Sequence, residues 1–92
     1  MDCIICGVKD NRNVNYDFVK YHESGLPIHE WTYFLNKKSF YTEKEAIYIA
    51  KSLIYENRVK NIRVMKLMPS GSWVKVDLQN SPYASLSLSP KG

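Results

Sequence analysis

Four residues in the N-terminal third of the chain have the types that bind zinc: Cys3, Cys6, His22 and His29. Two cysteines separated by two residues suit a tight metal-binding turn, and two imidazoles would complete a tetrahedral site. The later spacing departs from the zinc-finger pattern, because 15 residues separate Cys6 from His22. The other interpretation places both cysteines in an apolar strand, where a free thiol acts as a small hydrophobic side chain. We therefore expect no cofactor and keep zinc on these four residues as an alternative.

A second pattern alternates cations with tyrosines at spacings of four and three residues: Lys44, Tyr48, Lys51, Tyr55 and Arg58. On a helix these positions share one face, opposite the apolar positions of the same segment. Such a face suits an acidic protein partner, with the tyrosines as anchors, or phosphates with stacked bases. The alternative is an ordinary solvated helix face.

Further candidate contact residues are basic or aromatic and lie on both sides of this segment: Lys37, Lys38, Arg63, Trp73 and Lys75. We expect Arg63 and Lys75 on the sheet face away from the helix, with Trp73 near them. A sheet that carries aromatics and cations is typical of proteins that bind single-stranded nucleic acids. The chain has only three arginines, which disfavours sequence-specific DNA recognition.

Sequence motifs for catalysis are missing. The chain contains no glycine-rich phosphate loop, nucleophile elbow or HExxH pattern. A domain of this size also has little room for a deep catalytic cavity. We therefore expect that the protein is not an enzyme.

Hydrophobic periodicity and turn residues predict the elements that would position these side chains. Thr42 and Glu45 form a capping box, which predicts a helix over 43–57. Residues 9–15 are predicted as a loop, and the apolar run 3–6 as a strand or a metal-binding turn. The remaining strands are predicted at 16–21, 31–35, 62–68 and 73–78.

This order predicts an α+β fold, β-β-α-β-β with a possible extra N-terminal strand, in which one helix packs on one face of a small antiparallel sheet. The 92 residues suit one domain over 1–80, followed by a flexible tail over 81–92. The formal charge is +4, and residues 35–92 carry ten bases and four acids. We expect no membrane partner, because no apolar stretch is long enough to span a bilayer. The two cysteines favour the cytoplasm.

The segment from Trp31 to Leu78 resembles small accessory proteins of phages and mobile elements from AT-rich bacteria. The resemblance rests on the strand WTYFL, the helix entry FYTEKEA, and an Ile-Arg-Val strand closed by a tryptophan hairpin. It implies a modulator or inhibitor of host machinery, a group that includes anti-CRISPR proteins. We therefore expect a non-enzymatic binding protein whose partner is a host protein or complex. The alternatives are an RNA or single-stranded DNA binder and a small zinc protein, and pairing of sheet edges would allow a homodimer.

Overall fold

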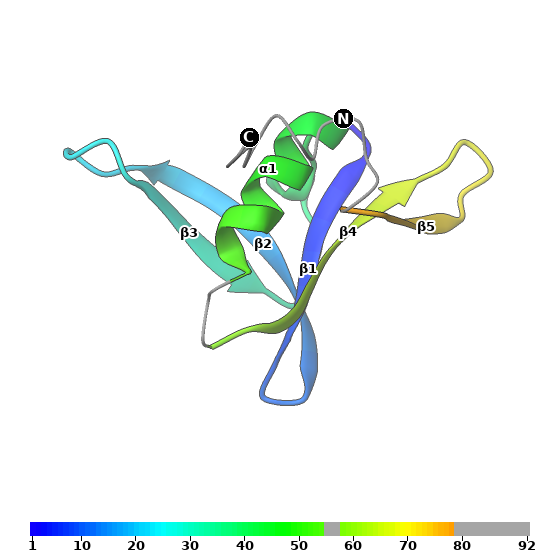
Figure 1. Ribbon diagram of the computed structural model, residues 1–92, viewed down its shortest axis with the longest axis horizontal. Coiled ribbons are helices and arrows are strands. Elements are labelled where there is room, and N and C mark those ends of the chain that lie inside the picture. The colour runs from blue at the N-terminus through cyan, green and yellow to red at the C-terminus, as the bar shows by residue number, and fades with distance from the viewer. Residues whose placement is uncertain (55–57, 79–92) are drawn as a thin grey trace, which may run out of the picture.

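A computed structural model describes residues 1–54 and 58–78 of the chain (Figure 1). Over these residues the chain forms five strands, one α-helix and one turn of 3₁₀-helix. In chain order they are β1 (Cys3–Lys9), β2 (Arg12–Tyr21), β3 (Pro27–Thr32), η1 (Lys37–Ser39), α1 (Glu43–Leu53), β4 (Lys60–Leu67) and β5 (Trp73–Val76). In this part of the chain, no helix has the length and apolar character needed to cross a membrane.

The five strands form one antiparallel sheet in the order β3-β2-β1-β4-β5. The central strand β1 is buried on both faces, with Cys3 and Ile5 on one face and Ile4 and Cys6 on the other. Its continuous apolar run therefore fits a fully covered strand. In Figure 1 the β2–β3 pair extends to the left and the β4–β5 pair to the right, and α1 lies between these two wings.

The helix α1 packs on one face of the sheet, as the sequence predicts. Ala46, Ala50 and Leu53 form the main core cluster together with four residues of the strands: Cys3, Ile5, Tyr16 and Val64. The two alanines keep the helix close to the sheet, because they add little bulk at the contact. An α+β architecture is therefore confirmed.

The predicted capping box begins the helix. The Thr42 hydroxyl accepts a hydrogen bond from the Glu45 N–H, and the Glu45 carboxylate accepts one from the Thr42 N–H, both at 3.1 Å. These bonds satisfy backbone donors that the first helical turn leaves unpaired. The helix ends at Leu53, with Ile54 as its C-cap. Residues 55–57 of the predicted helix lie outside the described residues.

The predicted order β-β-α-β-β is wrong, because three strands precede the helix. The possible extra N-terminal strand of the prediction is present as β1. The segment 9–15 was expected to be a loop, yet most of it belongs to β2. Only Asp10 and Asn11 turn, with φ angles of 53° and 63°, and these two residue types tolerate such left-handed angles. The polar side chains of this segment concealed the strand.

The strand expected at 31–35 is displaced in the structure, where β3 covers Pro27–Thr32. The C-terminal hairpin appears as predicted, with β4 and β5 slightly shorter or shifted at their ends. The predicted tail at 81–92 and the boundary at residue 80 lie outside the described residues.

Candidate functional site

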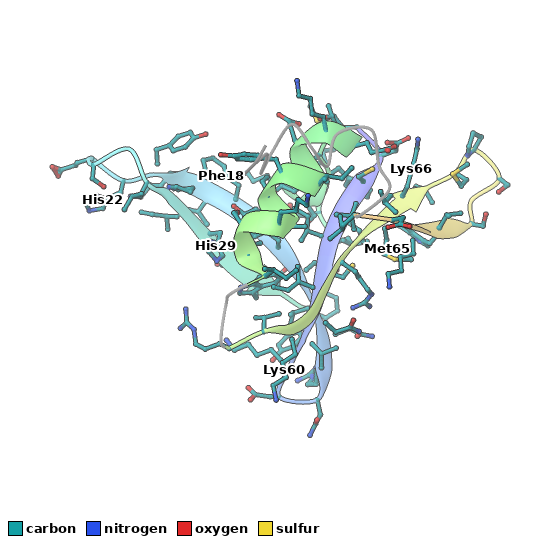
Figure 2. All side chains as sticks on the ribbon, viewed as in Figure 1. Phe18, His22, His29, Lys60, Met65 and Lys66 are labelled. Carbon is teal, nitrogen blue, oxygen red and sulfur yellow. The ribbon has the colours of Figure 1, made fainter. Side chains whose placement is uncertain are left out.

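The four predicted zinc ligands do not converge. Cys3 and Cys6 are three positions apart on β1, so their side chains point to opposite faces of the sheet. His22 lies exposed at the end of the β2–β3 hairpin, whereas His29 lies beside α1 (Figure 2). The described residues contain no group of three or more His, Cys, Asp or Glu side chains that could hold a metal ion. The structure therefore does not bring the four residues together, and both cysteines are strand residues of the core.

Burial also makes the two thiols chemically inert. Burial is the main cause that raises the pKa of Cys3 from 9.0 to about 11, and the nearby Asp2 carboxylate adds to it. Burial likewise raises the pKa of Cys6, which Arg63 partly opposes. Both groups are therefore neutral thiols at physiological pH, and a thiol is a poor nucleophile and a poor metal ligand.

The basic and aromatic helix face is formed in part within the described residues. Lys44 and Tyr48 are exposed and Lys51 is half-buried, on the side of α1 that faces away from the sheet. Tyr48 keeps 58% of its surface exposed, so it is available to a partner. Tyr55 lies outside the described residues, and Arg58 is exposed just beyond that gap.

The remaining predicted contact residues fall into two groups. Arg63, Trp73 and Lys75 lie on the sheet face opposite α1, which we call the outer face. The strand register shows this placement, because Lys75 pairs with Met65 in β4. The Trp73 ring stacks on Phe40 with centroids 6.3 Å apart. Lys37 and Lys38 form a separate exposed group on η1, which packs against β2.

A groove between α1 and the β2–β3 wing is a feature that the sequence did not indicate. Its volume is about 620 Å³, and α1 contributes Glu45, Ile49 and Ser52 to its wall. Figure 2 shows Phe18 and His29 beside α1 on this side of the molecule. Within the part of the chain that the structure describes, six aromatic rings line it, and we call it the aromatic groove: Tyr16, Phe18, Tyr21, His29, Tyr41 and Tyr48.

Strand alternation and a β-bulge bring these rings together. Tyr16 and Phe18 share the helix-facing side of β2, and the Tyr16 ring lies 4.9 Å from the His29 ring. The β2–β3 register shifts between Phe18 and Lys20, which turns the Tyr21 ring toward Phe18, with centroids 4.9 Å apart. A bulge is a common device for redirecting a side chain in this way.

Backbone and side-chain hydrogen bonds hold Tyr41 in the lining of the groove. Its backbone N–H and C=O both bond to Cys3, at 2.8 and 3.0 Å. Its hydroxyl accepts the N–H of Phe18 at 3.0 Å, which lies beside the bulge. Tyr41 therefore connects β1 with the β2 wall of the groove.

The lining of the aromatic groove is nearly uncharged. Burial raises the pKa of Tyr16 to about 12 and also raises that of Tyr41, so both remain neutral phenols. Among the described residues, Glu45 is the one carboxylate in the lining, and its Oε1 atom is held by the Thr42 N–H and hydroxyl. Such a lining suits the stacking and insertion of apolar or aromatic groups.

Comparisons with models of protein families, with curated proteins and with solved structures gave no match to this chain. The resemblance to phage accessory proteins therefore stays a prediction. The sequence carried one weak signal of the groove, namely the aromatic pattern at positions 16, 18 and 21 in β2. Positions 41 and 48 could not be joined to it without the tertiary structure.

Proposed function

We propose that this chain is a small non-enzymatic binding protein that receives part of a protein partner in its aromatic groove. The observation that carries the proposal is the set of six aromatic rings around one open groove of about 620 Å³. Tyrosine and other aromatic side chains dominate the energy of protein interfaces, especially where partner side chains enter pockets. The neutral lining supports binding by contact and stacking.

The helix face extends the groove into a larger surface. Tyr48 belongs to both, because its ring lines the groove while Lys44 and Lys51 lie beside it on α1. A partner that covers Tyr48 and continues over the exposed side of α1 would therefore meet these two lysines outside the groove. Rim charges of this kind speed association and favour acidic partners.

The partner that we propose is a host protein or complex, and the chain would act by covering a functional surface of it. This part of the proposal follows the resemblance to modulators from phages and mobile elements. The outer face with Trp73 offers a further contact area. The edge strands β3 and β5 also offer unpaired backbone to a second copy, which sedimentation at several protein concentrations tests.

Binding of RNA or single-stranded DNA is the second candidate, and Lys44 and Lys51 on either side of Tyr48 favour it. Single-strand binders combine stacking rings with cations that follow the phosphates. In this chain, however, the groove-facing side of α1 carries Glu45 and Ser52, and the lysines lie away from the groove. The arrangement therefore favours a protein partner.

Photo-crosslinking tests the proposal. A photoreactive amino acid replaces Tyr48 at the groove mouth or, as a matched control, the exposed Val74 on β5. Position 48 should capture a partner protein from the host lysate, and position 74 should not. A Tyr21→Ser change in the same groove should weaken the purified interaction by about 30-fold, as expected for the loss of an interface anchor.

Two treatments separate the candidate functions. Nuclease and raised salt should leave the crosslink at position 48 intact, because aromatic insertion depends weakly on ionic strength. Loss of the captured species with nuclease, or a steep salt dependence, would instead support the nucleic-acid candidate. Equal capture at positions 48 and 74 would contradict a role for the aromatic groove.

A further inference from the structure

Three consecutive large side chains protrude in the turn that follows β3. Tyr33, Phe34 and Leu35 keep 45%, 81% and 42% of their surface exposed. We call this segment the apolar tip. Single exposed apolar residues are common on protein surfaces, but a contiguous group of them marks a contact site.

The apolar tip is fixed in place at both ends. On one side the Thr32 hydroxyl donates a hydrogen bond to the Phe34 carbonyl at 2.9 Å. On the other side, the Asn36 amide donates to the Asp17 carboxylate at 2.9 Å, and Asp17 is only 5% exposed. The Asn36 side chain also caps η1 by accepting the Lys38 N–H at 2.7 Å. Phe34 is therefore exposed in a turn that hydrogen bonds hold in place at both ends.

Cations surround the apolar tip. The Arg12 guanidinium carbon lies 4.0 Å from the centre of the Tyr33 ring, which is a cation–π contact. Lys37 and Lys38 follow the tip directly and are exposed. Glu30 and the buried Asp17 line a shallow pocket together with these two lysines, so three cations stand against two carboxylates. The surroundings of the tip are therefore net positive.

We propose that the apolar tip inserts into the surface of an anionic lipid bilayer while Arg12, Lys37 and Lys38 contact the lipid phosphates. Aromatic and aliphatic side chains enter the boundary between headgroups and acyl chains, and each nearby cation adds affinity for anionic lipids. This contact differs from a membrane span, whose absence led to the sequence-based expectation of no membrane partner. It also uses residues separate from the aromatic groove.

Two observations favour a lipid surface over an acidic protein at this place. The apolar area is that of three side chains, far below the roughly 800 Å² that each partner gives to a stable protein interface. Two of the three cations are lysines, which are depleted in protein interfaces but effective at membranes. A bilayer also needs no complementary pocket for the protruding Phe34.

Vesicle co-sedimentation of the full chain tests the proposal. Vesicles that contain phosphatidylserine in phosphatidylcholine should bind the protein, and pure phosphatidylcholine should bind it at least about tenfold more weakly. Phe34→Ser should weaken binding to the anionic vesicles about tenfold, whereas Leu26→Ser at the opposite end of β3 should leave it unchanged. Both side chains are more than half exposed, so neither change should disturb folding.

Charge reversals provide a matched pair of variants. Lys37→Glu with Lys38→Glu should abolish binding to the anionic vesicles. Lys44→Glu with Lys51→Glu changes the net charge by the same amount and should retain most of the binding. Equal losses in the two double variants would show that net charge alone attracts the vesicles, and would overturn the proposal.

A direct probe reports insertion itself. Phe34→Trp should show a blue-shifted emission with anionic vesicles, measured as the difference from the wild-type spectrum. No binding by the wild type, or no shift at position 34, would overturn the lipid proposal. An acidic protein would then be the partner expected at the apolar tip. Because the groove residues are untouched in these variants, this failure would not affect the proposed groove function.

Discussion

Gly7 provides the sharpest test of the packing between β1 and β4. It lies where the register of these two strands shifts, between Cys6 and Val8. A Cβ atom at position 7 would overlap with Cγ1 of Val59 and would lie 3.2 Å from the carbonyl oxygen of Lys60. Only glycine therefore allows β4 to approach β1 so closely at this point.

The expected effect of Gly7→Ala is a net loss of about 1–2 kcal/mol in the free energy of unfolding. Val59 is 2% exposed and is stiff at χ1, so it cannot move aside freely. Overpacking of this kind costs about 1–3 kcal/mol. Alanine also lowers the conformational entropy of the unfolded chain relative to glycine, which offsets about 0.4–1 kcal/mol of this loss in stability. For a domain of this size the melting temperature should fall by about 5–15 °C.

A double-mutant cycle identifies the clash as the cause. Urea unfolding followed by far-UV circular dichroism gives the stability of wild type, Gly7→Ala, Val59→Ala and the double variant. Val59→Ala alone should cost about 2 kcal/mol through the cavity that it leaves. In the Val59→Ala background, Gly7→Ala should cost little or become stabilising. An equal cost of Gly7→Ala in both backgrounds would refute the reasoning.

Three further predictions concern the helix cap and the buried titratable groups. Thr42→Ala should lower the free energy of unfolding by about 1 kcal/mol, because the Glu45 N–H loses its acceptor. Thr42→Ser keeps a hydroxyl, so a urea titration in which it is no more stable than Thr42→Ala would contradict this role. The thiols of Cys3 and Cys6 should react with Ellman's reagent far more slowly in the folded protein than in urea, because both are buried with raised pKa values; equal rates would show that they are accessible. The stabilising contribution of the neutral Cys3 and Tyr16 groups should be fully present below about pH 9 and should be lost as the pH rises toward 12. The folded pKa values of Cys3 (about 11) and Tyr16 (about 12) exceed their ordinary values of 9.0 and 10.0, so the unfolded chain releases these protons first. A urea midpoint that rises over this range would contradict the assignment.

The sequence by itself determined the features that depend on near neighbours. Thr42 and Glu45 are three residues apart, so the capping box and the start of α1 could be predicted directly. The alternation of Val74 and Val76 with polar residues likewise predicted β5. These patterns are local because helix caps and strand faces involve residues within a few positions of one another.

Tertiary structure decided the placement of the candidate sites. Cys3 and His29 have metal-binding side chains, but β1 and β3 direct them into the core and into the aromatic groove. The groove joins Tyr16 with Tyr41 and Tyr48, far apart in the chain, through strand pairing, a bulge and the packing of α1. No local pattern encodes such a contact, because it depends on how the whole chain closes around its core.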